Sequence, residues 1–215
     1  MIKAFIFDLD GTLIDSEIAA AQAAQIVFRQ KNISIDLEQA VDLVYGRSWP
    51  DICTEITRRF PSVFDSPEQI DKLLHEKFVI LKNNGDMKIK NSIELLKQLS
   101  HNYPVCIVSG SPGKDVEAAI TLMGIESDLV FYLGCEDYTH GKPDPAGFLL
   151  AAEKLHLPPN QCLVFEDSAA GIKAAKRAGM YCVALSKTDA PKQDTSLADQ
   201  TLQDLSEFRL DMWMH

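Results

Sequence analysis

The 215-residue sequence lacks several features that define common protein classes. It has no long apolar stretch preceded by positive charges, so neither a secretion signal nor a membrane span is indicated. Positive charge is scarce, with 21 Lys and Arg against 31 Asp and Glu, which gives a formal net charge of −10. Because nucleic acids and anionic membrane surfaces bind basic patches, we expect neither as a partner. An anionic substrate must therefore be bound by local cations and backbone N–H groups.

The five cysteines are an odd number and show neither Cys-x-x-Cys spacing nor the Cys and His spacing of a zinc site. Cys106, Cys162 and Cys182 lie in apolar runs, which is typical of buried, reduced thiols. A thiol nucleophile is therefore not indicated, and we expect a cytoplasmic protein. Internal repeats and low-complexity segments are also lacking, while an apolar fraction of 46% is ample for a core. We expect a soluble, globular monomer.

What the sequence does contain is a series of short apolar runs at regular intervals, each of which predicts a strand. They cover residues 4–7, 105–108, 129–133, 162–165 and 182–185. The later runs alternate with helical segments at intervals of about thirty residues, as βα units do. Right-handed crossovers then favour an α/β fold, with a doubly wound, Rossmann-like parallel sheet and helices on both faces. Residues 186–215 are polar and predict no clear element.

Residues 16–83 carry no strand signal and predict a small all-α unit. Ser16 is placed to cap its first helix, and three more helices are expected after it. Because this unit separates the first strand from all the others, it is expected to be an insertion and not a tandem domain. We therefore predict an α/β core of residues 1–15 and 84–215, with an inserted helical cap of residues 16–83.

Two carboxylates, Asp8 and Asp10, directly follow the first apolar run. If the strand continued through Leu9, its period of two would put both on one face, and Gly11 would permit a tight turn. Two negative charges so close together repel each other, so a cation is expected between them. A hard ion such as Mg²⁺ accepts carboxylates and keeps positions for water and phosphate. The pair alone is equally consistent with an exposed Asp-x-Asp turn.

Other strand ends also carry polar side chains, at the edge where such sheets bind ligands. Ser109 and Gly110 follow the second run, where a hydroxyl and free N–H groups suit a phosphate oxygen. Lys142 precedes a proline that restricts the backbone and could be directed at a phosphoryl group. Glu166 and Asp167 extend the fourth run, and Asp167 would be a third carboxylate ligand.

Each of these positions also has an ordinary structural explanation. Ser111, which precedes a proline, is a candidate helix N-cap, and Asp167 could cap the next helix. Lys142 could be a solvated surface lysine. Their convergence from separate strands on one edge of the sheet nevertheless indicates a common site.

Four segments of the sequence resemble, in order, the four motifs of the haloacid dehalogenase (HAD) superfamily. The segments are residues 7–12, 108–110, 141–145 and 165–168 with Gly171. Over about residues 2–186 the chain is similar to the branch of this superfamily that contains β-phosphoglucomutase and sugar-phosphate phosphatases, with a helical cap after the first motif. The resemblance implies Mg²⁺-dependent phosphoryl transfer through an aspartyl phosphate.

By this resemblance, Asp8 would be the nucleophile and a Mg²⁺ ligand. Asp10 would protonate the leaving oxygen, then activate water, and would bind the metal through its backbone carbonyl. Members of the superfamily that attack carbon lack a carboxylate at the position of Asp10 and need no metal. The presence of Asp10 therefore argues for a phosphorylated substrate.

The resemblance also implies roles at the other strand ends. Ser109, Gly110 and Lys142 would bind the phosphoryl oxygens. Asp167 would complete the metal site, with Glu166 as a secondary ligand close by. Because a carboxylate is a weak nucleophile, the metal ion and Lys142 must neutralise the phosphoryl oxygens that would otherwise repel it.

In the cap, Gly46, Arg47 and Ser48 match the place where relatives carry a substrate-specificity loop. Arg47 could bind a second anionic group by a bidentate contact, or it could be a solvated surface arginine. Mutase members carry a proton-transferring histidine at the position of Ala20, and an alanine methyl cannot do this. We therefore predict a phosphatase, although another cap residue such as His75 could substitute.

The sequence thus predicts hydrolysis of a small phosphorylated metabolite, a sugar or sugar-acid phosphate. A phosphosugar mutase is the alternative. A phospho-switch receiver without turnover is a third possibility, but it would carry its phosphorylated Asp after the third strand, where this chain has residues 133–136. A purely structural binding module would not explain why charges meet at the strand ends.

Overall fold

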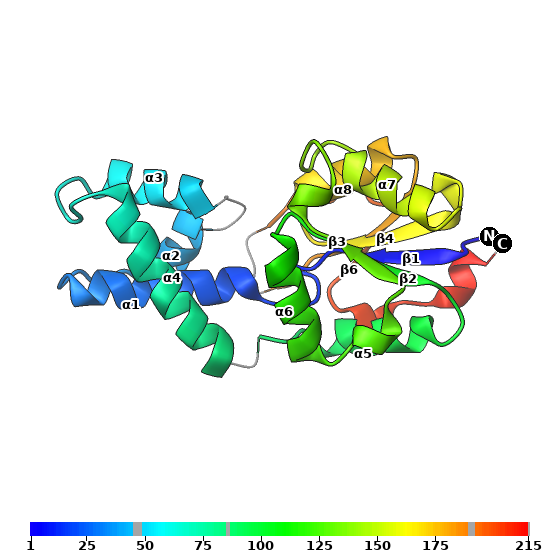
Figure 1. Cartoon of the computed structure of the whole chain (residues 1–215), viewed down its shortest axis with the longest axis horizontal. Helices are drawn as coiled ribbons and strands as arrows, with labels where there is room; N and C mark the ends of the chain where they lie inside the picture. Colours follow the sequence, from blue (N-terminus) through cyan, green and yellow to red (C-terminus); the bar gives the residue numbers. More distant parts are fainter. Residues whose placement is uncertain (45–48, 85–86, 189–191, 215) are drawn as a thin grey trace. The chain divides into compact units, whose positions relative to one another are not determined.

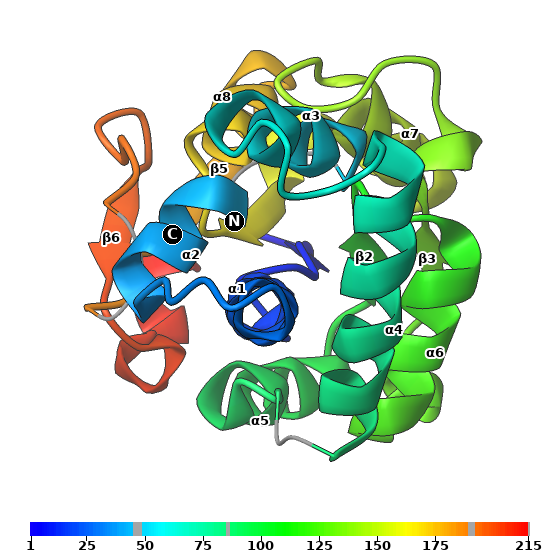
Figure 2. The same ribbon diagram turned by 90° about the vertical axis from the view of Figure 1, so that its left-hand side faces the viewer.

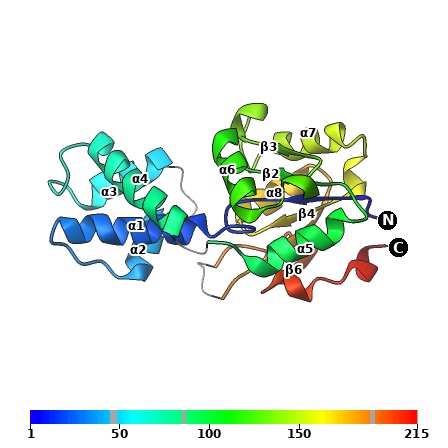
Figure 3. The same ribbon diagram turned by 60° about the horizontal axis from the view of Figure 1, so that its bottom comes forward.

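The apolar runs of the sequence form a six-stranded, all-parallel sheet of the order β3-β2-β1-β4-β5-β6. The strands are β1 Ala4–Phe7, β2 Val105–Val108, β3 Phe131–Leu133, β4 Cys162–Glu166, β5 Tyr181–Leu185 and β6 Gln200–Leu202. The order reverses at β1, which lies between β2 and β4 (Figure 3). This arrangement confirms the predicted doubly wound α/β fold, in which ligands bind beyond the carboxyl ends of the strands at the reversal.

The structure is a computed structural model, and it describes residues 1–44, 49–84, 87–188 and 192–214. The chain divides into two units (Figure 1). The α/β unit comprises Met1–Ile14 and Lys88–His215, and the helical unit comprises Asp15–Met87. None of the helices within these described ranges is both long and apolar enough to cross a membrane.

Helices cover both faces of the sheet in the α/β unit. They are α5 Lys90–Ser100, α6 Gly113–Met123, α7 Ala146–Lys154 and α8 Ala169–Arg177. The side chains of β1 alternate between two cores: Phe5 and Phe7 pack with α5 and α6, whereas Ala4 and Ile6 pack with α7 and α8. Because β1 is buried on both faces, its sequence is a continuous apolar run. The run ends at Phe7, so Asp8 and Asp10 follow the strand and do not belong to it.

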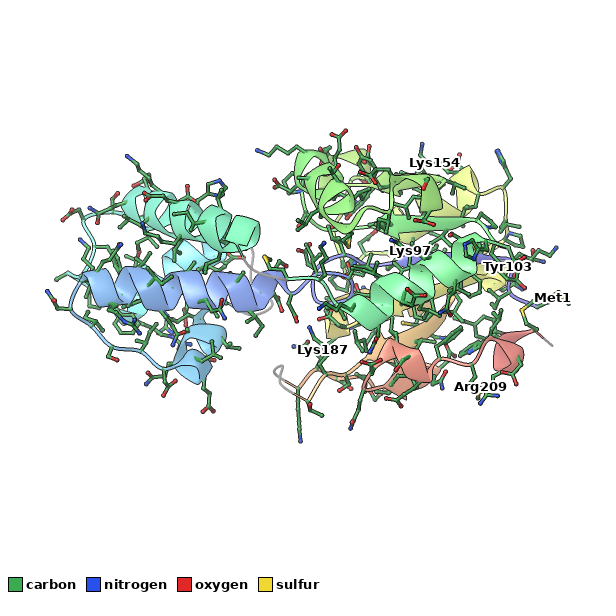
Figure 4. All side chains as sticks on the ribbon, turned by 90° about the horizontal axis from the view of Figure 1, so that it is seen from below. Met1, Lys97, Tyr103, Lys154, Lys187 and Arg209 are labelled. Atoms are coloured by element: carbon green, nitrogen blue, oxygen red, sulfur yellow. The ribbon has the colours of Figure 1, made fainter. Side chains whose placement is uncertain are left out.

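The C-terminal segment, for which the sequence predicts no element, joins the first of these cores. It contains β6 and two short 3₁₀ helices, Leu205–Glu207 and Leu210–Trp213. Phe208 packs on Phe165 with ring centroids 5.0 Å apart. The segment runs beside α5 towards the end of the unit where Tyr103 and Met1 lie (Figure 4). Its apolar side chains are widely spaced among polar ones, so no periodicity marks it in the sequence.

The helical unit contains α1 Ser16–Gln30, α2 Leu37–Val44, α3 Trp49–Arg59 and α4 Pro67–Asn84. Both α2 and α4 pack against α1, which Figure 2 shows end-on. The core includes Phe28, Ile56 and Ile70. The expected cap at Ser16 is wrong: Ser16 is the first helical residue, and the N-cap position is Asp15, without a side-chain capping bond.

We predict that Phe208→Ala lowers the free energy of unfolding of the α/β unit by about 3 kcal/mol, because it removes a buried ring from the aromatic cluster. Phe208 is 8% exposed, whereas Met212, in the same segment, is 61% exposed. The control Met212→Ala should change stability by less than about 0.5 kcal/mol. Urea denaturation followed by circular dichroism measures both. Equal losses in the two variants would show that the segment does not belong to the core.

Candidate active site

The strand register brings several predicted site residues to one edge of the sheet. Phe7 of β1 pairs with Phe165 of β4, and the Asp8 N–H donates to the Phe165 carbonyl at 2.9 Å. The residues that follow this pair, Asp8 and Glu166, therefore lie beside each other. On the other side of β1, the end of β2 leads directly to Ser109.

Three acidic side chains meet at this edge. Carboxylate oxygens of Asp8, Glu166 and Asp167 lie within 4.8 Å of one another. The three residues are only 5%, 1% and 5% exposed, respectively. Negative charges at this depth are unfavourable unless cations accompany them, and buried carboxylate oxygens are the ligands of hard divalent ions. The cluster can therefore hold an ion such as Mg²⁺.

Two glycines make room for these carboxylates, because they have no side chain. A Cβ atom on Gly11 would lie 2.0 Å from Asp167 Oδ2, and the φ of +89° at Gly11 also disfavours a side chain. A Cβ atom on Gly171 would lie 1.7 Å from Glu166 Oε1. Any larger residue at either position would displace a carboxylate of the cluster.

Lys142 supplies a positive charge to the cluster. Its Nζ donates to Asp8 Oδ1 at 2.5 Å and to Glu166 Oε1 at 2.6 Å. The ammonium also lies 5.3 Å from the centre of the Phe148 ring, a cation–π contact. Its side chain is only 13% exposed. Lys142 is therefore not the solvated surface lysine that the sequence left as an alternative.

Glu166 connects Lys142 to the start of α8. While its Oε1 accepts from Lys142, its Oε2 accepts from the Ser168 N–H at 2.7 Å and the Ser168 hydroxyl at 2.9 Å. The Ser168 hydroxyl in turn accepts from the Gly171 N–H at 3.1 Å, so Ser168 and not Asp167 caps α8. Both carboxylate oxygens of Glu166 are thus engaged by protein donors.

Asp10 has a different set of partners from Asp8. Its Oδ2 accepts from the Ser111 hydroxyl at 2.7 Å and from the Ser109 hydroxyl at 3.2 Å. The interpretation of Ser111 as a helix N-cap is wrong: the N-cap of α6 is Pro112, and no side chain caps this helix. The Ser111 hydroxyl instead contacts a candidate catalytic carboxylate.

Tyr138 is a site residue that the sequence analysis missed. Its hydroxyl donates to the Ser109 carbonyl at 2.7 Å. Because the C=O and N–H of a trans peptide point in opposite directions, this bond directs the N–H of Gly110 away from the tyrosine. A Cβ atom on Gly147 would lie 3.0 Å from the ring, so this glycine makes room for it. Tyr138 lies in a polar connection, where no periodicity indicates a long-range contact.

Burial and neighbouring charges shift the pKa values of Asp8 and Lys142. The pKa of Asp8 is raised from 3.8 to about 8. Burial is the largest cause and raises it, the charge of Lys142 lowers it, and the charges of Glu166 and Asp10 raise it. Burial lowers the pKa of Lys142, but the charges of Asp8 and Glu166 outweigh burial and raise it above its usual range. One ammonium thus does not balance the buried carboxylates.

The candidate residues of the helical unit are only partly described. Gly46, Arg47 and Ser48 lie outside the described residues. Ala20 is buried in the core of the helical unit. His75 is exposed on α4, and its ring centre lies 6.2 Å from that of Trp49.

The cysteines do not offer a nucleophile. All five are free thiols, and four of them are buried, Cys135 being exposed. Burial raises the pKa of each thiol, to about 11 for both Cys53 and Cys162. The thiols therefore stay protonated at neutral pH and are poor nucleophiles.

Comparison with known proteins identifies the family that these residues belong to. Residues 2–179 match the family model of haloacid dehalogenase-like hydrolases. The chain is a member of this hydrolase family. The resemblance that the four motifs predicted is therefore confirmed over most of the chain.

Relatives of this HAD-like hydrolase include named phosphatases. The validoxylamine A 7′-phosphate phosphatase of Streptomyces hygroscopicus subsp. limoneus is 32% identical, over 100% of this chain and 98% of its own length. The fructose-1-phosphate phosphatase YqaB of Escherichia coli is 26% identical, over 83% of this chain and 93% of its own. The crystal structure of β-phosphoglucomutase from Clostridium difficile shares the fold, with a TM-score of 0.75 at 22% identity over 99% of this chain and 96% of that one.

The raised pKa of Asp8 predicts a pH-dependent stability of the metal-free protein. Folded Asp8 keeps its proton up to about pH 8, whereas unfolded Asp8 releases it near pH 3.8. Between these values the folded state binds more protons, so the stability that protonated Asp8 contributes is lost as the pH rises. The variant Asp8→Asn does not titrate. In EDTA, we expect it to be more stable than the wild type at pH 8, with a smaller advantage at pH 5.

Urea denaturation at the two pH values measures this difference. The control Asp211→Asn changes an aspartate whose side chain is 72% exposed and should show the same small difference at both. An advantage of Asp8→Asn that does not grow with pH would contradict the raised pKa.

Proposed function

We propose that this HAD-like hydrolase is a Mg²⁺-dependent phosphatase that acts on a small phosphorylated metabolite through an aspartyl phosphate on Asp8. The observation that carries the proposal is the buried contact of Asp8 with Lys142, 2.5 Å apart, in a cluster of oxygen ligands. A carboxylate nucleophile needs such a neighbouring cation to approach an anionic phosphoryl group.

The proposed reaction has two steps. In the first, an Asp8 oxygen forms a bond to phosphorus while the bond from phosphorus to the substrate's alcohol oxygen breaks. Asp10 gives its proton to that oxygen, so the alcohol leaves neutral. In the second, a water oxygen attacks the phosphorus, Asp10 takes a proton from this water, and phosphate leaves Asp8. Ser109, Lys142 and the Gly110 N–H bind the phosphoryl oxygens during both steps.

The proposed metal ligands are the side chains of Asp8 and Asp167 and the backbone carbonyl of Asp10. Buried carboxylate oxygens within 4.8 Å of one another suit a small, hard cation. When bound, Mg²⁺ offsets the negative charge of the phosphoryl oxygens. The contacts of Glu166 with Lys142 and Ser168 favour a different role for Glu166, that of positioning the Lys142 ammonium.

The relatives support a substrate class. We propose a sugar phosphate or a sugar-acid phosphate, and the relatives that are named phosphatases of validoxylamine A 7′-phosphate and of fructose-1-phosphate support the first of these. We propose that residues 16–83 act as a cap that selects this substrate and excludes water. Within the cap, Gly46, Arg47 and Ser48 would contact the part of the substrate beyond the phosphoryl group.

Hydrolysis is favoured over the mutase reaction because the chain has Ala20, which carries no proton-transfer group, where the mutases have a histidine. We further propose a cytoplasmic monomer that binds neither nucleic acid nor membranes, in keeping with the net charge of −10. A mutase would instead form an isomer, primed by a bisphosphate, faster than it releases phosphate.

With Mg²⁺, the wild type should release phosphate from 4-nitrophenyl phosphate and from sugar phosphates. Phosphate release should stop in EDTA and resume when excess Mg²⁺ is added. Asp8→Asn should lower kcat by about a thousandfold or more, because the amide cannot attack phosphorus. The control Asp211→Asn should keep full activity. A phosphate-release assay measures these rates. Full activity of Asp8→Asn would refute the nucleophile and with it the proposed function.

Two neighbouring variants distinguish a metal ligand from a residue that positions Lys142. Asp167→Asn should raise the Mg²⁺ concentration at half-maximal rate by about tenfold or more. Glu166→Gln should leave that concentration within about threefold but lower kcat by about tenfold to a hundredfold, because Lys142 loses a charged partner. Rates measured across a Mg²⁺ titration give both quantities. If Glu166→Gln raises the Mg²⁺ requirement as much as Asp167→Asn does, Glu166 is a ligand.

A further inference from the structure

The Ser111 hydroxyl has no role in the reaction proposed above, yet it makes the shorter of two hydroxyl contacts to Asp10. Its Oγ donates to Asp10 Oδ2 at 2.7 Å, whereas the Ser109 hydroxyl reaches the same oxygen at 3.2 Å. Both serines belong to the turn that follows β2, and Asp10 belongs to the turn that follows β1. The contact therefore joins two strand ends that are distant in sequence.

The two serines differ in what they can do once a substrate is bound. A serine hydroxyl has a single proton to donate. If Ser109 donates it to a phosphoryl oxygen, as the proposed function requires, it no longer donates to Asp10. Ser111 then keeps Asp10 Oδ2 in place through its own hydroxyl. The shorter distance fits this division between the two side chains.

The backbone of Ser111 is held on both sides. Its N–H donates to Ser109 Oγ at 3.0 Å, and its carbonyl accepts from the Cys135 N–H at 3.0 Å. The neighbouring turn is packed so closely that a Cβ atom on Gly134 would lie 2.5 Å from the Gly113 nitrogen. The Ser111 hydroxyl is thus presented to Asp10 by a rigid turn, as a preorganised donor must be.

We propose that Ser111 is a positioning residue, which orients the Asp10 carboxyl for proton transfer to the leaving oxygen. This inference rests on the proposed function, in which Asp10 is the general acid. Ser111 acts through Asp10 and needs no contact with the substrate. Its loss should therefore matter most when the leaving group needs a proton.

Two substrates whose leaving groups differ in their need for a proton test the role of Ser111. An alkoxide leaving from a sugar phosphate needs the proton of Asp10, whereas 4-nitrophenolate is stable enough to leave without one. The ratio kcat/KM reports only the steps up to the departure of the leaving group. Ser111→Ala should lower kcat/KM for the sugar phosphate about tenfold more than for 4-nitrophenyl phosphate, the effect expected for a hydrogen bond to the carboxylate that Asp10 becomes as it gives up its proton. Asp10→Asn should show the same preference more strongly.

Three further variants separate positioning from a general loss of structure. Ser111→Thr keeps the hydroxyl and should restore most of the sugar-phosphate activity. Ser100→Ala removes another serine-to-aspartate bond, from Ser100 to Asp128 at 2.9 Å, and should leave both ratios unchanged. If Ser111→Ala does not fold, Ser111→Cys has nearly the same shape and a weaker donor, and should show the same leaving-group preference.

Equal losses for the two substrates, or no loss, in the folded Ser111 variants would overturn the role of Ser111 while leaving the phosphatase intact. Full activity of Asp8→Asn would instead overturn the proposed function. Failure of the Ser111 proposal and failure of the proposed function are therefore measured in different variants.

Discussion

The contact between the Asp8 carboxyl group and the Lys142 ammonium is the interaction on which the rest of the site depends. It joins the end of β1 to the connection after β3, and Glu166 extends it to the start of α8. Each group would be costly to bury alone, and together they remain short of positive charge. This imbalance supports the cation that we propose for the cluster. Gly11 and Gly171 let the carboxylates approach closely, because a Cβ atom at either position would overlap Asp167 or Glu166.

The two carboxylates for which we propose different chemical tasks are separated by a single residue. Leu9 is buried in the core between Asp8 and Asp10, and the two carboxylates turn to different partners. Asp8 contacts the Lys142 ammonium, and a carboxylate nucleophile needs such a positive charge nearby to approach an anionic phosphoryl group. Asp10 meets hydroxyls, which orient a carboxyl without supplying a full positive charge. One short turn after β1 thus provides two carboxylates in two distinct surroundings, which acid–base and nucleophilic roles require.

Sequence reasoning succeeded where a local pattern had one physical meaning. Continuous apolar runs mark strands buried on both faces, so β1 and β2 were found with their observed bounds. Runs broken by polar residues gave weaker signals, and β6 was missed because only Leu202 of its three residues is buried. The capping predictions for Ser16 and Ser111 failed for a common reason. Neither serine occupies the N-cap position, because Ser16 is already helical and Ser111 precedes the N-cap residue Pro112.

The sequence by itself determined the family, the α/β class and the main candidate residues. The four motifs and the apolar runs are local features, so they can be recognised without knowing which distant segments are in contact. Only the tertiary structure decided which side chains are partners: Glu166 with Lys142, Ser111 with Asp10, and Tyr138 with the Ser109 carbonyl. Strand register and the close approach of turns set these pairs, and both arise from packing between segments far apart in sequence.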